Sequence, residues 1–322
     1  MQAIQLCQAQ SQQRAVTNRS TVDTSHPFFD CFRAYADVVA FLDALVAAHA
    51  SRVTPVQVAT TVQGRAIRGF KLTLTTSSPS AKPIVYVQAG IHPREWISIS
   101  SAIYAMAKLL ESPHEQVFDV VDVIVVPVVN VDGYIFTWAA PANRLWRKNL
   151  HAVDLNRNFG PASLFQPSTD TTSETYPGVN ATSEPETAGI TAFLKGLASD
   201  LRGTLDVHTT AGMVLWPLSV STEPLTGKHA AKMTDVGGAV ASAMNAASKS
   251  VYTSIPGYKL YQGALYAGTF KDMVYLMLNQ TPSLTIELKG DDTFTAPNDS
   301  IRPSGDDLVA AIRTFAAQVH NY

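Results

Sequence analysis

Residues 84–98 read IVYVQAGIHPREWIS, and the first half of this stretch decides the fold class. IVYVQAG is a run of branched, aromatic and small residues, interrupted by one glutamine and ended by a glycine. Such a run is typical of a strand that is buried on both faces of a parallel sheet. Because helical crossovers cover parallel sheets, the stretch predicts an α/β fold.

The chain on either side of this stretch alternates between helical and strand patterns. Apolar residues recur at helical spacing from Tyr35 to Val46. We expect helices over residues 35–46, 98–110, 183 onward, 228–247 and 304–319. We expect further strands over residues 56–62, 69–75, 117–129, 204–207 and 283–288. This order predicts a three-layer α/β sandwich, in which helices flank a mixed, largely parallel central sheet.

The domain organisation follows from composition along the chain. Residues 1–26 are polar and aperiodic, so we expect an N-terminal arm or remnant segment. Residues 27–322 contain no repeat or linker and are expected to form one domain. Irregular segments at 130–182, 209–226 and 252–282 are long for a compact domain, and such loops usually carry function.

The overall composition excludes several classes of protein. Apolar residues make up 46% of the chain and charged residues 16%, which is enough for a large core and unlike a disordered chain. The net charge of −2 gives no basic excess for nucleic acid, so we expect no nucleic-acid partner. No apolar run is long enough to cross a bilayer, so we expect no membrane partner and a soluble chain.

The two cysteines, Cys7 and Cys31, bear on the compartment of the protein. They could form a disulfide, two buried thiols or half of a metal site. The sequence contains no CxxC motif, which argues against a cysteine-based zinc site. The N-terminus lacks the apolar core of a signal peptide, so the chain is either cytosolic or exported with its signal removed. Four N-glycosylation triplets favour a secreted protein with a disulfide, and they begin at Asn18, Asn180, Asn279 and Asn298.

HPRE, directly after the buried strand, is a candidate metal-binding motif. His92 and Glu95 are three residues apart and can reach one point if the chain bends there. An imidazole and a carboxylate suit catalytic zinc, which takes three protein ligands; a solvated surface pair is the alternative. His208 is the best third candidate because it follows the strand TLDV, where α/β sheets place their sites. His151 competes for this role, and His208 could also be an ordinary core histidine.

A cationic segment, NRLWRKNLHAVDLNRNFG (143–160), is a candidate binding site for an anion. Its charges lie among aromatic residues, which is unlike a fully solvated face. Arginine binds carboxylates through two parallel hydrogen bonds, so the segment indicates an anionic substrate group; a surface cluster paired with acidic neighbours is the alternative. The cationic residues are Arg144, Arg147, Lys148 and Arg157.

Glu287 is a lone acidic residue in the apolar stretch LTIELKG. Burial would raise the pKa of its carboxyl, which suits a general base acting on water. The alternative is a strand-end glutamate paired with a cation such as Lys289.

Taken together, the segments HPREW, NVDGY, NRLWRKN, DLNRNF, SETYPG and TIELKG resemble the zinc carboxypeptidase A/B family, and they occur in that family's order. The resemblance runs from about Phe28 to the C-terminus. It implies one zinc ion per chain, held by His92, Glu95 and His208, with Asp154 orienting His92.

The resemblance also implies roles for the substrate-facing residues. Glu287 would be the general acid and base, and Arg147 would polarise the scissile carbonyl and hold its oxyanion. Asn156 and Arg157 would grip the terminal carboxylate of the substrate, with Arg94 and Arg144 as auxiliary groove residues. The expected activity is removal of C-terminal amino acids from peptides and proteins by a monomeric enzyme.

Three positions depart from the family pattern. The mobile tyrosine that caps the substrate has two candidates, Tyr261 and Tyr266, and we favour Tyr266 because LYAGTFKDMVY resembles the family segment with a shortened loop. Thr210 stands where the family carries a tyrosine. At the floor of the pocket for the C-terminal side chain stands Lys271, which predicts a preference for terminal Glu or Asp, unless the shortened loop turns it to solvent.

Two other functions compete with this interpretation. A zinc amidase or deacylase for small N-acyl amino acids would need the same residues, because its substrates share the free carboxylate. A non-catalytic binding module that kept the fold should have lost a zinc ligand or the base, and this chain retains all four.

Overall fold

The computed structural model describes residues 6–9, 21–74, 82–226, 228–290 and 293–321. Within them, the strands form one sheet in the order β1-β2-β4-β3-β5-β6, and β7 pairs with β5 off this path. The seven strands are β1 (Val53–Thr60), β2 (Ala66–Leu72), β3 (Ile84–Ala89), β4 (Asp122–Val126), β5 (Leu201–Trp216), β6 (Thr253–Pro256) and β7 (Ser283–Lys289).

The sheet is mixed and largely parallel, as predicted. The outer pairs β1–β2 and β2–β4 are antiparallel. The inner pairs β3–β4, β3–β5, β5–β6 and β5–β7 are parallel. The carboxyl end of β3 at Ala89 lies beside Val207 of β5, and the next residue of β5, His208, lies opposite Glu287 near the carboxyl end of β7. Open α/β sheets place their ligands at the carboxyl ends of parallel strands.

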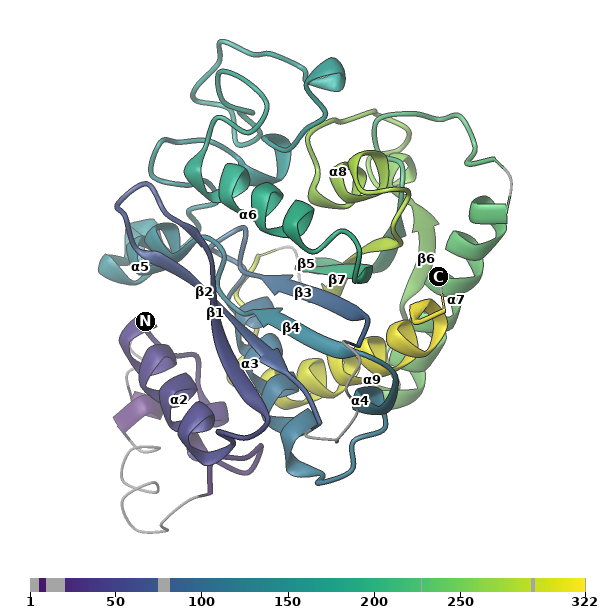
Figure 1. Cartoon of the computed structure of the whole chain (residues 1–322). Helices are drawn as coiled ribbons and strands as arrows, with labels where there is room; N and C mark the ends of the chain where they lie inside the picture. Colours follow the sequence, from purple (N-terminus) through teal and green to yellow (C-terminus); the bar gives the residue numbers. More distant parts are fainter. Residues whose placement is uncertain (1–5, 10–20, 75–81, 227, 291–292, 322) are drawn as a thin grey trace.

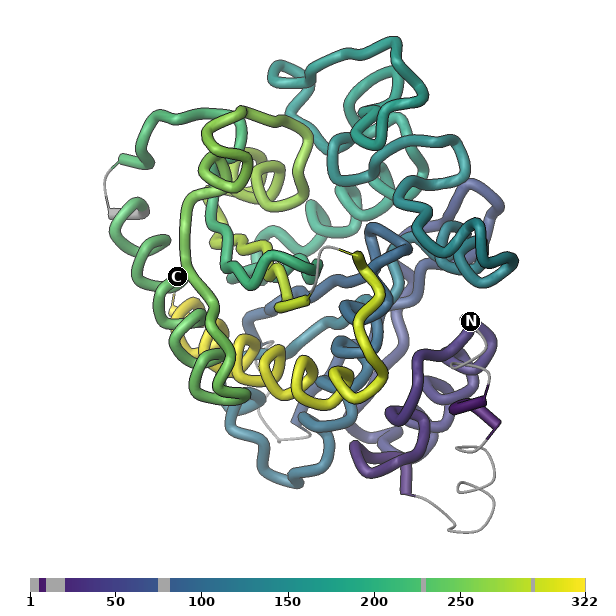
Figure 2. Tube along the Cα trace, turned by 180° about the vertical axis from the view of Figure 1, so that it is seen from behind, coloured from purple at the N-terminus to yellow at the C-terminus, as the bar shows by residue number. Residues whose placement is uncertain are grey.

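Helices cover both faces of the sheet (Figure 1), which confirms the predicted sandwich. Alternate residues of β3 divide between the two layers: Val85 and Val87 join one core cluster, while Ile84 and Tyr86 join the other. The first cluster includes α2 (Tyr35–Ala48), α3 (Trp96–Glu111), α4 (Val117–Val120), α7 (Lys228–Ser248) and α9 (Ile301–Val319). The second cluster includes α6 (Pro185–Gly196) and α8 (Phe270–Met277). Seen from behind, α7 and α9 pack against each other along the first face (Figure 2).

The prediction of one strand over residues 117–129 is wrong at its start. Residues Val117–Val120 form the helical turn α4, and only Asp122–Val126 form β4. The turn buries Phe118 in the first core cluster while Asp119 stays exposed, an arrangement that an apolar run does not reveal.

Two α-helices and a strand lie in segments that we expected to be irregular, besides short 3-10 turns. These are α5 (Val131–Ala139), β6 and α8. Side chains cap both helices: Asn130 accepts from the Gly133 amide at 2.9 Å, and Thr269 accepts from the Asp272 amide at 3.3 Å. In addition, β5 continues to Trp216, well beyond the predicted residues 204–207.

A disulfide joins Cys7 to Cys31, whose Cα atoms are 6.1 Å apart. Residues 6–9 form a helical turn that this bond ties to the body of the protein. The boundary at residue 26 stays a prediction, and residues 1–5 and 10–20 of the expected arm lie outside the described part of the chain. Among the described helices, none is long and apolar enough to span a membrane.

Candidate active site

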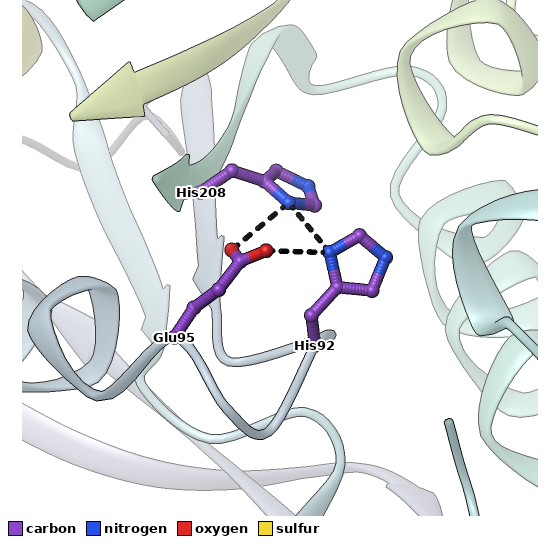
Figure 3. A group of neighbouring side chains, drawn as sticks. All are labelled: His92, Glu95 and His208. Atoms are coloured by element: carbon purple, nitrogen blue, oxygen red, sulfur yellow. Dashed lines mark hydrogen bonds and ion pairs between the residues drawn. The ribbon is translucent and has the colours of Figure 1, made fainter. Parts of the chain in front are cut away.

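Three segments bring His92, Glu95 and His208 together (Figure 3). His92 lies in the turn after β3, Glu95 precedes the first residue of α3, and His208 lies within β5. The turn depends on Gly90, whose φ is +69°; a β-carbon there would meet Ile99 Cγ1 at 2.7 Å. Because β3 and β5 are adjacent and parallel, the end of β3 delivers the HPRE turn beside His208.

The ligand atoms of the three residues converge on one point. Glu95 Oε1 is 2.8 Å from His92 Nδ1, Glu95 Oε2 is 3.2 Å from His208 Nδ1, and the two Nδ1 atoms are 3.1 Å apart. All three side chains are buried. Two imidazole nitrogens and one carboxylate that face each other form the donor set of catalytic zinc, which leaves further coordination positions open.

The opposite nitrogen of His92 is held by Asp154. Its Nε2 is 3.1 Å from Asp154 Oδ1, and Arg147 donates to Asp154 Oδ2 through Nε at 3.0 Å and Nη2 at 2.8 Å. Burial raises the pKa of Asp154, but the charges of Arg147 and His92 outweigh burial and hold the pKa well below its usual range. An ionised carboxylate at this distance can orient the His92 ring, and this role of Asp154 stays a prediction.

Glu287 lies on β7 directly opposite His208 in the strand register. Burial of the carboxyl raises its pKa to about 7, and the neighbouring Glu95 raises it while His208 lowers it. The alternative pairing with Lys289 is absent: no cation among the described residues forms an ion pair with Glu287. A carboxyl with a pKa near neutrality can take up and release a proton during turnover.

A cavity of about 190 Å³ joins these groups to the substrate-facing residues. The cavity is lined by the three candidate ligands, Glu287, and most of the residues expected to bind substrate. These are Arg147, Asn156, Arg157, Tyr266 and Lys271.

Sequence comparison matches residues 38–311 to the family described as zinc carboxypeptidase, peptidase family M14. The chain belongs to the zinc carboxypeptidase family. Zinc carboxypeptidase A 1 of Drosophila melanogaster is 30% identical over 302 residues, covering 88% of this chain and 68% of that protein. The crystal structure of carboxypeptidase A from Helicoverpa armigera is 27% identical with a TM-score of 0.80, covering 98% of this chain and 81% of that one.

Family membership identifies a metallocarboxypeptidase that uses one zinc ion and acts at peptide C-termini. One relative, from Sclerotinia sclerotiorum, is named an inactive metallocarboxypeptidase; it is 27% identical over 325 residues, covering 89% of this chain and 54% of that one. The present chain keeps the ligand set and Glu287 in one cavity. The four residues that we expect to carry zinc and the proton therefore lie together in one cavity.

The competing histidine, His151, does not join the candidate zinc ligands of this carboxypeptidase. His151 has a side chain that is 56% exposed, and its Nδ1 lies 2.7 Å from Glu184 Oε2. Of the two candidates for the third position, only His208 belongs to the cluster.

Arg94 and Arg144 lie beside the cavity and do not line it. Arg144 stacks on Trp96, 3.8 Å from the ring centroid, and donates to the carbonyl oxygens of Arg94 at 2.7 Å and Phe294 at 2.6 Å. Arg94 pairs with Glu174 at 2.8 Å and lies 4.2 Å from the Phe294 ring centroid. Both arginines thus hold Phe294, which does line the cavity, and their direct contact with substrate stays a prediction.

The two candidate capping tyrosines occupy different environments. The Tyr266 ring forms part of the cavity wall, with Arg157 Cζ 4.7 Å from its centroid, and its hydroxyl donates to the Gly257 carbonyl at 3.0 Å. Tyr261 is 49% exposed, and its ring centroid is 5.0 Å from that of Tyr266. Both tyrosines line the cavity, and the assignment of Tyr266 as the capping residue stays a prediction.

Lys271 is only 1% exposed and lines the cavity, so the alternative that it turns to solvent is wrong. Its Nζ donates to Asp272 Oδ1 at 3.0 Å and to Ser219 Oγ. Gly257 makes room for the ammonium group, because a β-carbon there would lie 2.6 Å from Nζ. Burial lowers the pKa of Lys271, and Asp272 opposes this shift.

Sequence reasoning missed Ser219 and Gly257, which pack against Lys271, and Phe294, which lines the cavity. No local sequence pattern marks these three residues. It also missed Asp206, for which a signal exists: like Glu287, it is a lone carboxylate in an apolar strand, TLDV.

Proposed function

We propose that this carboxypeptidase holds zinc with His92, Glu95 and His208 and removes C-terminal residues, with a preference for glutamate and aspartate. The observation that carries the preference is the buried ammonium of Lys271 in the cavity that also contains Arg157. The roles proposed for the individual residues are supported by their positions in this cavity.

Bound zinc would polarise the scissile carbonyl and lower the pKa of an attacking water. Glu287 would accept the proton of that water and pass it to the departing amine, which its pKa of about 7 permits. Arg147 would donate to the oxygen that gains negative charge. Asn156 and Arg157 would hold the α-carboxylate; among the described residues, no carboxylate forms an ion pair with Arg157, so its charge is available.

A second cation in the same cavity favours a substrate with a second carboxylate. Within the described chain, the Lys271 ammonium has two oxygen partners, Ser219 Oγ and Asp272 Oδ1, so one of its three hydrogens has no acceptor. A terminal Glu or Asp side chain would supply that acceptor and balance the buried charge. An apolar side chain would leave the ammonium without it, at a cost in binding.

Replacement of Lys271 by methionine, which keeps the length of the side chain, should reverse the preference. We expect wild-type kcat/KM to be about 10- to 100-fold higher for a peptide ending in Glu than for its Gln counterpart, as a charged hydrogen bond implies. Lys271→Met should lose this difference and turn over the Leu peptide at least as well as the wild type. The measurement is kcat/KM on peptides that differ only in a terminal Glu, Gln, Leu or Lys.

Lys195→Met is the matched control, since Lys195 is exposed on α6, outside the cavity. This variant should keep the wild-type order of kcat/KM on the four peptides. Equal or better hydrolysis of the Leu peptide by the wild-type enzyme would refute the acidic preference while leaving carboxypeptidase activity itself in place.

We also propose that the protein works outside the cell as a monomer, with residues 27–322 as its catalytic domain. The Cys7–Cys31 disulfide supports an oxidising compartment, because such bonds are rare in the cytosol. Peptide and protein C-termini are the proposed partners.

A further inference from the structure

Asp206 is a buried carboxylate that the proposed mechanism leaves without a role. It lies on β5, two residues before His208, and is fully buried. Because side chains alternate along a strand, Asp206 and His208 project from the same face of the sheet. In the described part of the chain, its one ion-pair partner is His208, and no lysine or arginine forms an ion pair with it.

Each oxygen of Asp206 has a separate partner. Oδ2 lies 2.8 Å from His208 Nε2, and Oδ1 accepts from Gln88 Nε2 at 2.9 Å. Gln88 is the register partner of Asp206 on β3, and its own oxygen accepts from the Tyr86 hydroxyl at 3.1 Å. Tyr86 and Gln88 are also fully buried, so the carboxylate is fixed from behind by a chain of hydrogen bonds within the sheet.

Two neighbours compete for His208 Nε2, and they favour different tautomers. Asn156 Nδ2 lies 3.2 Å away and can only donate, because Asn156 Oδ1 accepts from the Phe270 amide at 2.8 Å and thereby fixes the amide. A donor at Nε2 would place the imidazole proton on Nδ1, the atom that faces His92 and Glu95. The Asp206 carboxylate only accepts, and at 2.8 Å it is the closer of the two.

We infer that Asp206 is a positioning residue for the third zinc ligand: it keeps the proton of His208 on Nε2 and the lone pair of Nδ1 directed at the metal. The inference rests on the proposed zinc site. Asp154 acts on His92 in the same way from the other side, so each histidine ligand has its own carboxylate. A carboxylate that accepts from a ligand histidine strengthens that histidine as a donor to zinc.

The test is the zinc affinity of Asp206→Asn, measured by competition with a chromogenic chelator. In this variant the new amide oxygen can satisfy Gln88, which turns its NH2 group toward Nε2 and favours the wrong tautomer. We expect the zinc dissociation constant to rise about 10- to 100-fold, and the absorption spectrum of the cobalt-substituted enzyme to change. The midpoint of thermal unfolding of the metal-free protein reports any general loss of stability.

Asp307→Asn is the matched control, because Asp307 is a buried carboxylate on α9 that accepts from the Tyr252 hydroxyl at 2.8 Å. It should change stability without changing zinc affinity. If Asp206→Asn does not fold, Gln88→Met removes only the donor behind Asp206 and should weaken zinc binding in the same direction, by a smaller factor.

A folded Asp206→Asn whose zinc dissociation constant stays within about twofold of the wild type would overturn the inference. If Asp206→Asn does not fold, an unchanged zinc dissociation constant in Gln88→Met would overturn the inference as well. Failure of the wild-type protein itself to bind zinc would instead refute the proposed metal site, so the two failures are distinguishable.

Discussion

Glu287→Gln should lower kcat by about 10²- to 10⁴-fold while the protein keeps its fold and its zinc. The glutamine has the same shape but cannot take a proton from water. Glu287 is not among the three residues that converge on the metal position, so its replacement leaves the ligand set intact. Zinc content, thermal unfolding and kcat on a peptide ending in Glu are the three measurements.

Glu223→Gln provides the same chemical change at an exposed position and should leave kcat unchanged.

The wild-type enzyme should also lose activity as the pH falls below neutrality, because protonation of Glu287 removes the base. Burial places the pKa of Glu287 at about 7, and a bound cation nearby would move this acid limb to lower pH. Retention of full kcat by a zinc-loaded Glu287→Gln enzyme would contradict the assigned role.

Arg147→Met should lower kcat/KM by about 10²- to 10³-fold, the usual effect of losing one donor to an oxyanion. The guanidinium lines the cavity, and it is also fixed by two hydrogen bonds to Asp154. Because Asp154 holds His92, we expect a smaller, additional loss of zinc affinity. Arg147→Lys should recover only part of the activity, because an ammonium cannot make both bonds to Asp154 and also reach the substrate.

The affinity for a phosphonate analogue of the transition state separates these effects. If Arg147 stabilises the oxyanion, analogue affinity and kcat/KM should fall in parallel across the variants. Arg202→Met, which removes an arginine outside the cavity, serves as the control. A rise in KM with kcat unchanged would show that Arg147 contributes only ground-state binding.

The central sheet was predictable from a strong local signal, whereas the local pattern of the metal site left alternatives open and its ligand set followed from the resemblance to a family. IVYVQAG has no polar face, which already implies burial on both sides and hence helices on both faces. HPRE follows the end of that strand, and His208 follows TLDV on the adjacent parallel strand, next to Val207, which is the register partner of Ala89. The functional role of Glu287 was predicted because burying a carboxylate in an apolar strand is unfavourable in free energy unless the group has a partner or a role.

The walls of the substrate pocket were not predictable in the same way. The burial of Lys271 depends on Ser219 and Gly257, which approach it from other segments of the chain. The short helices α5 and α8 begin at capping side chains, Asn130 and Thr269, inside segments too short for a clear helical period. The environment of Tyr266 likewise depends on a tertiary contact, its hydrogen bond to Gly257.

The most direct test combines metal removal with a substrate whose C-terminus can be blocked. The chain, stripped of metal by a chelator, is titrated with zinc while release of glutamate is followed from a peptide with a free C-terminus and from the same peptide amidated. We predict that release from the free peptide is lost on metal removal and returns with one zinc per chain, and that the amidated peptide is not cleaved, because Asn156 and Arg157 then have no carboxylate to hold. Release that survives metal removal, or equal cleavage of the amidated peptide, would contradict a zinc-dependent carboxypeptidase.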